Sequence, residues 1–185
     1  MSLIVLVGPA GVGKGSVVKE LLAMGGYRLS VSATTRPARP EEVDGVHYHF
    51  VSREEFVQMI EGDQLIEWAK VHGDHYYGTP RSEIRRAVAD KVHLILEIDL
   101  QGARQIVDRG IDFIGIFLEP PSWDELERRL RTRGTETEME IQTRLATARE
   151  ELAAADEFEN RLVNDNLRAT AEKIHGLVTK REEKK

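Results

Sequence analysis

The sequence predicts an α/β fold in which strands and helices alternate around a mainly parallel sheet. Three observations support this prediction. Short apolar runs such as Leu3–Val7 lack polar alternation, which is typical of strands buried on both faces. Segments with helical spacing of apolar residues follow most of these runs. A glycine-rich stretch joins the first run directly to the first helical segment, an arrangement that suits phosphate binding.

The predicted strands are short apolar or β-prone runs bounded by turn residues. In chain order they are Leu3–Val7, Leu29–Ala33, His47–Val51, Leu65–Val71, His93–Ile98, Asp112–Leu118 and Arg161–Asn164. The stretch Arg36–Gly45 contains two prolines and several charges, so we expect a loop there.

The predicted helices are marked by apolar residues at 3–4 spacing and by capping residues at their starts. In chain order they cover Lys14–Met24, a segment after Ser52, one after Thr79, Gln101–Asp108, segments after Ser122 and Thr137, and a last one from about Leu167. Ser52, Ser122 and Thr137 each precede a glutamate by three residues, the pattern of a capping box. Thr79 is followed by Pro80, which suits a cap and a first helical position.

Composition and charge limit the possible functions. The chain has 185 residues, of which 41% are hydrophobic and 31% charged, as expected of one soluble globular domain. It has no cysteine, which excludes a disulfide scaffold, a thiolate zinc site and a cysteine nucleophile. The net charge of −6 argues against a nucleic-acid partner. Arginine outnumbers lysine by 18 to 8, and guanidinium groups suit small phosphates and carboxylates.

The apolar runs also argue against a membrane partner. The longest, Leu3–Val7 and Phe113–Leu118, fall far short of the ~20 residues that cross a bilayer. The N-terminus lacks the basic flank and small-residue cleavage site of a signal peptide. We therefore expect a cytoplasmic protein.

A phosphate-binding loop is predicted between the first strand and the first helix. It comprises Gly8, Pro9, Ala10, Gly11, Val12, Gly13, Lys14, Gly15 and Ser16. Glycines let the backbone N–H groups turn toward phosphate, and the helix N-terminus adds about half a positive charge. Lys14 would place a full charge at the β and γ phosphates. A glycine-rich turn without a ligand is the structural alternative.

The hydroxyl of this loop stands one residue later than the strict pattern requires, because Gly15 follows Lys14 and Ser16 comes next. This ending resembles that of many nucleoside monophosphate kinases. We expect Ser16 to contact phosphate or Mg²⁺, directly or through water. Ala10 stands where related sequences often have serine, so one loop hydroxyl is missing.

Five further blocks resemble guanylate kinases in their order and spacing. They are residues 32–50 (SATTRPARPEEVDGVHYHF), 66–69 (IEWA), 76–79 (YYGT), 97–102 (EIDLQG) and 133–138 (RGTETE). The spacing departs from that of the family only by about one extra residue near Gly73–His75, and with the phosphate loop the blocks cover essentially the whole chain. The resemblance implies an enzyme that uses MgATP to phosphorylate GMP and dGMP, giving GDP and ADP.

The same resemblance implies how the single domain, residues 1–185, is organised. It implies a P-loop three-layer α/β/α fold whose core is formed by residues 1–32, 86–122 and 149–185. A GMP-binding lobe with short strands is inserted at about 33–85, and a helical lid covers about 123–148. We expect the lobe and the lid to close only when both nucleotides are bound.

A site for the phosphate of GMP is implied in the lobe. Arg36 and Arg39 lie three residues apart in a loop, and Tyr48 follows nine residues later. The resemblance implies that these residues and Tyr77 hold the phosphate, since two guanidiniums and two phenols can bind a dianion without hydrolysing it. For either arginine alone, a solvated basic loop is the simpler interpretation.

Guanine offers N1–H and its 2-amino group as neighbouring donors and O6 as an acceptor. The resemblance implies that Glu67 accepts both donors and that Ser32 and Thr79 contact the base. Adenine lacks this donor pair, so Glu67 would discriminate against AMP. The alternatives are an exposed strand glutamate at Glu67 and a simple helix cap at Thr79.

Two carboxylates end an apolar strand on the side where ligands bind in open α/β sheets. Alternation places Glu97 and Asp99 on one face. We expect Asp99 to contact the guanine side, directly or through water, and Glu97 to lie near Mg²⁺. The alternative is that either one only caps the helix at Gln101. The six histidines form no cluster typical of a metal site.

The lid is predicted from crowded arginines. Four arginines occur between 128 and 133, where like charges repel unless an anion neutralises them. The resemblance places Arg129, Arg133 and Arg144 over the triphosphate and Asn164 near the adenine. The catalytic residues are then Lys14, Arg36, Arg129, Arg133 and Arg144. Nearby glutamates are the alternative partners of the arginines, and Asn164 would otherwise simply end a strand.

Three other functions fit parts of the pattern. One is a kinase for another nucleoside monophosphate, against which Glu67, Ser32 and Thr79 argue. Another is a non-catalytic module that binds a partner protein, but such modules typically lose the phosphate-loop or lid residues kept here. The third is a P-loop GTPase, whose N-K-x-D type of guanine-reading loop is not found in the sequence.

Overall fold

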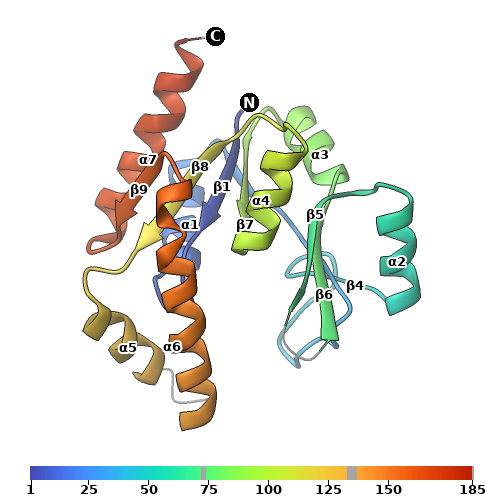
Figure 1. Ribbon diagram of the computed structural model, residues 1–185. Helices are drawn as coiled ribbons and strands as arrows, with labels where there is room; N and C mark the ends of the chain where they lie inside the picture. The colour runs from blue at the N-terminus through green and yellow to red at the C-terminus, as the bar shows by residue number, and fades with distance from the viewer. Residues whose placement is uncertain (72–73, 133–136, 185) are drawn as a thin grey trace.

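The computed structural model describes residues 1–71, 74–132 and 137–184 (Figure 1). The strands are β1 (Leu3–Val7), β2 (Tyr27–Leu29), β3 (Ala33–Thr34), β4 (His49–Phe50), β5 (Leu65–Val71), β6 (His75–Pro80), β7 (His93–Glu97), β8 (Ile114–Glu119) and β9 (Asn160–Val163). The helices are α1 (Lys14–Met24), α2 (Arg53–Glu61), α3 (Ser82–Asp90), α4 (Leu100–Asp108), α5 (Trp123–Thr132), α6 (Glu138–Ala153), the short η2 (Ala155–Glu157) and α7 (Leu167–Glu182).

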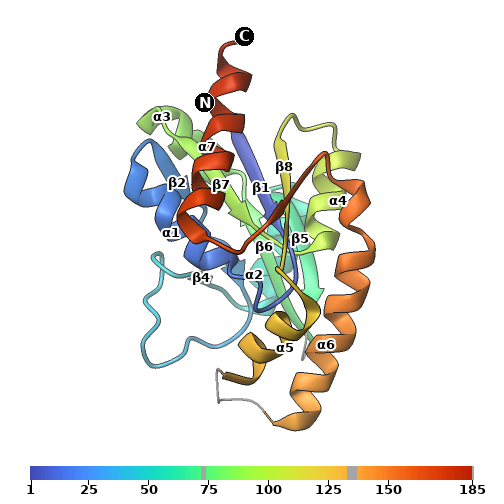
Figure 2. The same cartoon turned by 90° about the vertical axis from the view of Figure 1, so that its left-hand side faces the viewer.

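The central sheet is parallel, with the strand order β2-β7-β1-β8-β9. Alternate residues of β1 enter two different apolar clusters. Ile4 and Leu6 pack with α1 and α7, whereas Leu3, Val5 and Val7 pack with α3 and α4. Figure 2 shows α1 and α7 on one side of the sheet and α4 on the other. The predicted three-layer α/β/α fold is therefore confirmed.

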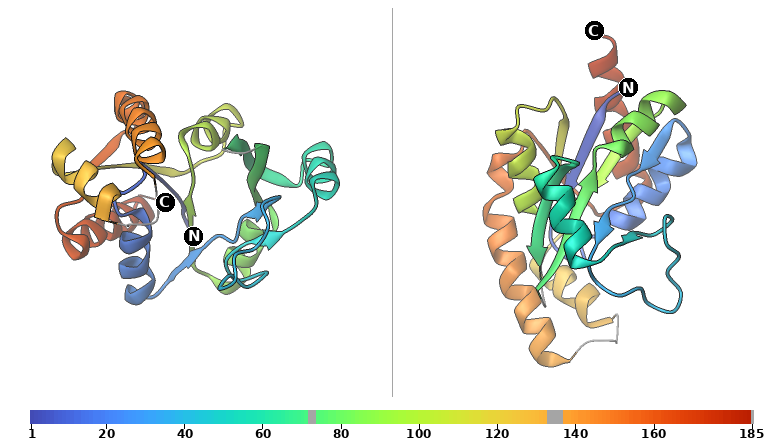
Figure 3. Two further views of the ribbon diagram at one scale, coloured as in Figure 1. Left: turned by 90° about the horizontal axis from the view of Figure 1, so that it is seen from below. Right: turned by 90° about the vertical axis from the view of Figure 1, so that its right-hand side faces the viewer.

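A second, smaller sheet has the order β4-β3-β6-β5 and packs against α2. Its small core contains Ala33, Phe56 and Leu65. Seen from below in Figure 3, α2 and this sheet lie on one side of the molecule and α5 and α6 on the other. The small sheet falls within the predicted lobe at 33–85, and α5 with most of α6 falls within the predicted lid at 123–148.

The single strand predicted over Leu29–Ala33 is wrong, because the chain changes sheets there. The N–H of Ser30 still donates to the carbonyl of Ile95 in the central sheet, whereas Ala33 pairs with Gly78 in the small sheet. The strand predicted over His47–Val51 is confirmed only at His49–Phe50.

The helix start predicted at Thr79 is also wrong. Thr79 and Pro80 end β6, and α3 begins at Ser82 after Arg81. Thr79 pairs with Glu67 across β5 and β6, and this tertiary pairing outweighs the local capping preference. Pro80 is tolerated because it lies at the end of a strand.

The capping boxes predicted at Ser52 and Thr137 are confirmed at the starts of α2 and α6. At Ser122 only half of the box is described. The Ser122 hydroxyl accepts from the N–H of Glu125, but the Glu125 carboxylate accepts from Arg128 and Arg129. Within the described ranges, no helix is long and apolar enough to span a membrane.

Candidate functional site

Three of the predicted site features, which are the glycine-rich loop, Glu97 and Asn164, lie at the carboxyl edge of the central sheet. The glycine-rich loop follows β1, which lies in the middle of the sheet between β7 and β8. Glu97 ends β7, and Asn164 directly follows β9. Open parallel sheets bind ligands at this edge, so the topology brings residues from distant parts of the chain to one place.

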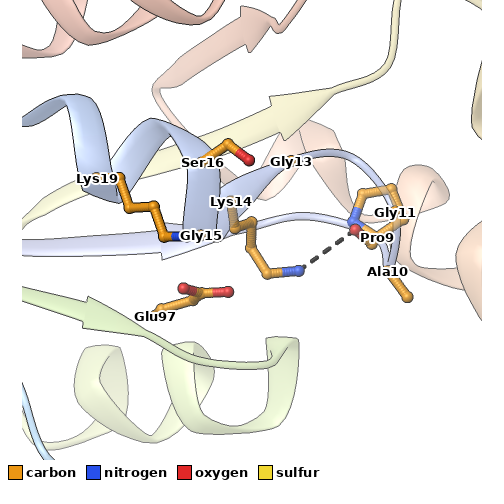
Figure 4. A pocket seen from close by; sticks show the side chains of 9 residues that line it. All are labelled: Pro9, Ala10, Gly11, Gly13, Lys14, Gly15, Ser16, Lys19 and Glu97. Atoms are coloured by element: carbon orange, nitrogen blue, oxygen red, sulfur yellow. Dashed lines mark hydrogen bonds between the residues drawn. The ribbon is translucent and has the colours of Figure 1, made fainter. Parts of the chain in front are cut away.

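The loop encloses a cavity of about 330 Å³ (Figure 4). The residues that line it are Pro9, Ala10, Gly11, Gly13, Lys14, Gly15, Ser16, Lys19 and Glu97. The Lys14 ammonium donates to the carbonyls of Gly8 at 2.5 Å and Pro9 at 3.3 Å, so a full positive charge lies against the loop. The predicted phosphate loop is therefore accompanied by a second cation, Lys19 of α1, which the sequence analysis did not single out.

Oxygen atoms suited to Mg²⁺ line the same cavity. The Ser16 hydroxyl and the Glu97 carboxylate are both in its wall, and Glu97 Oε2 lies 3.8 Å from the position a Cβ would take at Gly15. Within the described ranges, no three His, Asp or Glu side chains converge as a metal site. One carboxylate and one hydroxyl fit Mg²⁺ held mainly by substrate phosphates rather than by a protein cage.

Three of the four residues predicted for the GMP phosphate come together in the small lobe. The guanidinium of Arg36 donates from Nε to the Tyr77 hydroxyl at 3.2 Å and lies 5.3 Å from the centre of the Tyr48 ring. The rings of Tyr48 and Tyr77 are 6.0 Å apart, edge to face. Arg39 is exposed in the same loop, where its N–H donates to Glu42 at 2.8 Å.

Glu42 is a residue that the sequence analysis missed. Its carboxylate accepts two bonds from Arg36, at 2.7 and 2.8 Å, in a bidentate ion pair. These bonds hold the pKa of Glu42 down at about 2. An acidic residue six positions after Arg36 is too common a feature to have signalled this pairing.

Tyr48 is a half-buried residue of the lobe whose hydroxyl is influenced by several nearby charges. Burial raises the pKa of the Tyr48 hydroxyl, Tyr77 raises it further, Arg36 opposes this shift, and the charge of Glu97 adds a smaller rise. Because Glu97 also lines the loop cavity, Tyr48 is within electrostatic range of the cavity wall.

Glu67 is a buried carboxylate, with only 3% of its surface exposed. Its Oε1 accepts from the Thr79 hydroxyl at 2.6 Å, and its Oε2 lies against Gly102, where any Cβ would clash with it. Burial raises its pKa to about 7, and the charge of Asp99 adds to the shift. The alternative of an exposed strand glutamate is wrong, because β5 packs against α4 at this point.

The side chain of Asp99 and the carbonyl of Ser32 each accept a hydrogen bond from a backbone N–H group. Asp99 Oδ1 accepts from the N–H of Gly102 at 2.8 Å, so Asp99 does cap the helix that follows it, α4. Its contact with guanine stays a prediction. Ser32 is half-buried between β2 and β3, and its carbonyl accepts from the N–H of His49 at 2.9 Å.

The lid arginines are largely paired with glutamates. Arg129 donates to Glu125 at 2.8 Å and to the carbonyl of Val12 at 3.2 Å, which joins α5 to the phosphate loop. Arg144 is half-buried on α6 and interacts electrostatically with Glu140. Arg133 lies outside the described residues. The alternative partners, nearby glutamates, are thus confirmed for Arg128, Arg129 and Arg131.

Two residues approach the loop from other elements. Asn164 is 1% exposed and donates from Nδ2 to the Val12 carbonyl at 2.8 Å. Glu151, which the sequence analysis did not select, lies on α6 within electrostatic range of Lys14 and Asp99. Burial raises the pKa of Glu151. No local pattern could have identified it, since α6 carries many similar glutamates.

Comparisons with known proteins point to one family. A family model described as guanylate kinase matches residues 1–181. A guanylate kinase from Synechococcus sp. is 49% identical over 177 residues, covering 95% of this chain and 81% of the relative. One from Cutibacterium acnes is 50% identical over 168 residues, covering 90% and 84%. The crystal structure of guanylate kinase from Anaplasma phagocytophilum matches with a TM-score of 0.78 and 32% identity, covering 97% of this chain and 85% of that chain.

Proposed function

The chain belongs to the guanylate kinase family, and from this membership we propose that it transfers the γ-phosphoryl group of ATP to GMP, forming ADP and GDP. It is an enzyme of the nucleoside monophosphate kinase class. The observation that carries the proposal is the buried Glu67 in the same small lobe as the cluster of Arg36, Tyr48 and Tyr77. These side chains match one purine monophosphate, and the phosphate loop matches a second nucleotide.

We assign the donor phosphates to the loop. Its N–H groups, the start of α1 and the Lys14 ammonium would bind the β and γ phosphates of ATP, and Lys19 supplies a further charge nearby. Ser16 and Glu97 would hold the Mg²⁺ that accompanies ATP. When bound, this ion neutralises charge on the phosphates.

We assign the acceptor phosphate to Arg36, Arg39, Tyr48 and Tyr77. An oxygen of the GMP phosphate forms a bond to the γ-phosphorus as the bond from that phosphorus to the β–γ bridging oxygen breaks, so ADP leaves with the bridging oxygen. A phosphate monoester is largely dianionic at neutral pH, so no general base is required. Lys14 and the arginines 36, 129, 133 and 144 would stabilise the charge that develops in transfer.

Base selection is assigned to Glu67, with Ser32, Thr79 and Asp99 as further contacts. An ionised Glu67 can accept the paired donors of guanine, whereas adenine would present a lone pair to it. None of the proposed base and phosphate contacts involves the 2′-hydroxyl, so we include dGMP as a substrate. We keep a cytoplasmic location within this proposal, because both substrates would come from the cell's nucleotide pool.

A coupled ADP-release assay with GMP, dGMP, AMP and UMP, each with and without Mg²⁺, tests the proposal. We expect turnover with GMP and dGMP only, and only with Mg²⁺. Lys14→Ala should abolish turnover but leave GMP binding nearly intact, because Lys14 lies on the ATP side of the site. Lys173→Ala, an exposed site on α7, is the matched control and should behave as the parent protein. A folded protein that does not consume ATP with GMP would refute the enzymatic function and favour a binding module.

A further inference from the structure

One backbone carbonyl of the phosphate loop accepts hydrogen bonds from two distant parts of the chain. The carbonyl of Val12 accepts from Asn164 Nδ2 at 2.8 Å and from Arg129 Nη1 at 3.2 Å. Asn164 comes from the connection between β9 and α7, and Arg129 from α5. The two lone pairs of this oxygen are therefore both used.

Asn164 is fixed in place by its surroundings. Its own N–H donates to the carbonyl of Glu119 at 2.8 Å, which continues the pairing of β9 with β8 by one residue. Its side-chain nitrogen lies 2.7 Å from the position that a Cβ would take at Gly13. Gly13 also has φ +100°, so only glycine allows this approach without strain.

The buried amide is not explained by packing alone. Asn164 Oδ1 is buried and has no hydrogen-bond partner among the described residues. A buried polar atom without a partner lowers stability, and an apolar side chain of similar size would avoid that penalty. The presence of asparagine here therefore indicates that the hydrogen bond donated by its Nδ2 to the Val12 carbonyl has a role.

The geometry of the peptide unit shows what that donor controls. In a trans peptide the C=O of one residue and the N–H of the next point in opposite directions within one plane. Fixing the Val12 carbonyl therefore fixes the direction of the Gly13 N–H. Gly13 lines the loop cavity, whereas Val12 and Asn164 do not.

We propose that Asn164 is a positioning residue for the phosphate loop, which holds the Val12 carbonyl outward so that the Gly13 N–H points into the cavity. Arg129 provides the second hydrogen bond to the Val12 carbonyl, and this bond can be exchanged for another. It is partly exposed and also binds Glu125, so it can turn toward the triphosphate while Asn164 keeps the carbonyl in place. This inference rests on the proposed function and adds a role that differs from a contact with adenine.

Tripolyphosphate separates the two roles, because it has the phosphates of ATP but no base. We would titrate tripolyphosphate and ATP, each with Mg²⁺, into the full chain and into Asn164→Ala. Losing one buried hydrogen bond that orders the loop should weaken both ligands by up to about tenfold. Asn164→Asp keeps the shape but removes the donor, so it should weaken both ligands at least as much.

Asn160→Ala is the matched control. Asn160 lies on the same strand, and its Nδ2 donates to the carbonyl of Gly115 at 2.9 Å, away from the loop. We expect this variant to lower the melting temperature but to leave both affinities within about twofold of the parent protein. Melting temperatures of all variants show whether each protein is folded. If Asn164→Ala does not fold, Asn164→Asp takes its place in the comparison.

Each result bears on a different claim. Weaker ATP binding with unchanged tripolyphosphate binding would overturn the inference and leave Asn164 as an adenine contact. Unchanged affinity for both ligands, with only a lower melting temperature, would overturn it in favour of a purely structural role. A parent protein that binds neither ligand and does not phosphorylate GMP would overturn the proposed function itself. A parent protein that does both, with tripolyphosphate and ATP both bound more weakly by the Asn164 variants but not by Asn160→Ala, would support the inference.

Discussion

Glu67 is a buried side chain whose surroundings change its protonation. Its carboxylate is enclosed by Thr79 and Gly102, and burial raises its pKa to about 7. A carboxylate with few partners in the free protein gains most from a ligand that brings two donors. The same group in an exposed strand position would gain little, because water would already satisfy it.

Glu67→Gln should lower selectivity for GMP. The amide can accept at only one atom and presents a donor at the other, so the paired donors of guanine lose one acceptor. We expect the ratio of kcat/KM for GMP over AMP to fall by roughly 10- to 100-fold. Glu54→Gln, an exposed change on α2, is the control. An unchanged ratio would assign base recognition to other residues.

Guanosine binding should depend on pH through Glu67. The raised pKa means that the neutral acid is favoured below about pH 7, whereas accepting both donors requires the carboxylate. Affinity for guanosine should therefore rise as the pH increases from about 6 to 8, with release of a proton that calorimetry in buffers of different ionisation enthalpy detects. Guanosine is used because the phosphate of GMP titrates in the same range. Glu67→Gln should remove the dependence of guanosine affinity on pH. An affinity of the parent protein that does not change between about pH 6 and 8 would contradict the prediction.

The same shift affects the stability of the ligand-free protein. The folded pKa of about 7 lies above the ordinary value of 4.5, so folding favours the protonated group. This contribution to the free energy of unfolding is complete below about pH 4.5 and is lost as the pH rises through about 7. Ligand affinity and stability therefore respond to pH in opposite directions.

At the scale of elements, two loops hold their cations on internal acceptors. Lys14 donates to carbonyls of its own loop, and Arg36 uses Nη1, Nη2 and Nε on Glu42 and Tyr77. Under the proposed function, an incoming phosphate would take over some of these bonds. The loop between β3 and β4 therefore keeps Arg36 in place before a ligand arrives. The Glu42 carboxylate that holds it would also compete with the ligand's phosphate for the Arg36 guanidinium.

Glu42→Gln should strengthen GMP binding. It keeps a hydrogen-bond acceptor for Arg36 but removes the negative charge that competes with the phosphate. We expect a gain of about 3- to 5-fold in affinity for GMP, the size of a partly exposed ion pair, and no change for guanosine. Glu41→Gln, the exposed neighbour, is the control. Weaker GMP binding would instead show that the charge of Glu42 is needed to orient Arg36.

At the scale of the whole molecule, two sets of elements extend from the carboxyl edge of the central sheet. The small sheet with α2 carries the residues proposed to bind GMP, and α5 with α6 carries Arg129 and Arg144, which are proposed to act as a lid (Figure 1). Phosphoryl transfer benefits when such parts close on the substrates, because water is excluded and hydrolysis of ATP is suppressed.

Closure should be visible by small-angle X-ray scattering. We expect the radius of gyration to decrease when GMP and a non-hydrolysable ATP analogue are added together with Mg²⁺, and to change less with either nucleotide alone. The reason is that the arginines of the lobe and the lid meet a complete anion only in the ternary complex. AMP in place of GMP is the control, and equal scattering curves with and without both ligands would contradict the expectation.

The sequence by itself determined those features that depend on neighbouring residues. An unbroken apolar run specified β1, glycines followed by Lys14 specified the loop, and the capping boxes at Ser52 and Thr137 specified two helix starts. Each of these signals lies within a few neighbouring residues, so it can be recognised without knowing the fold. The family resemblance added residue assignments that such local patterns do not contain.

Only the tertiary structure decided the features that join distant segments. Thr79 has the local pattern of a helix cap, yet pairing of β5 with β6 makes it a partner of Glu67. Asn164 follows an edge strand, yet the strand order brings it onto the Val12 carbonyl, 152 residues away. Strand pairing and burial depend on the whole chain, so the neighbours of a side chain, and hence its charge state and hydrogen bonds, are set by segments that no local pattern describes.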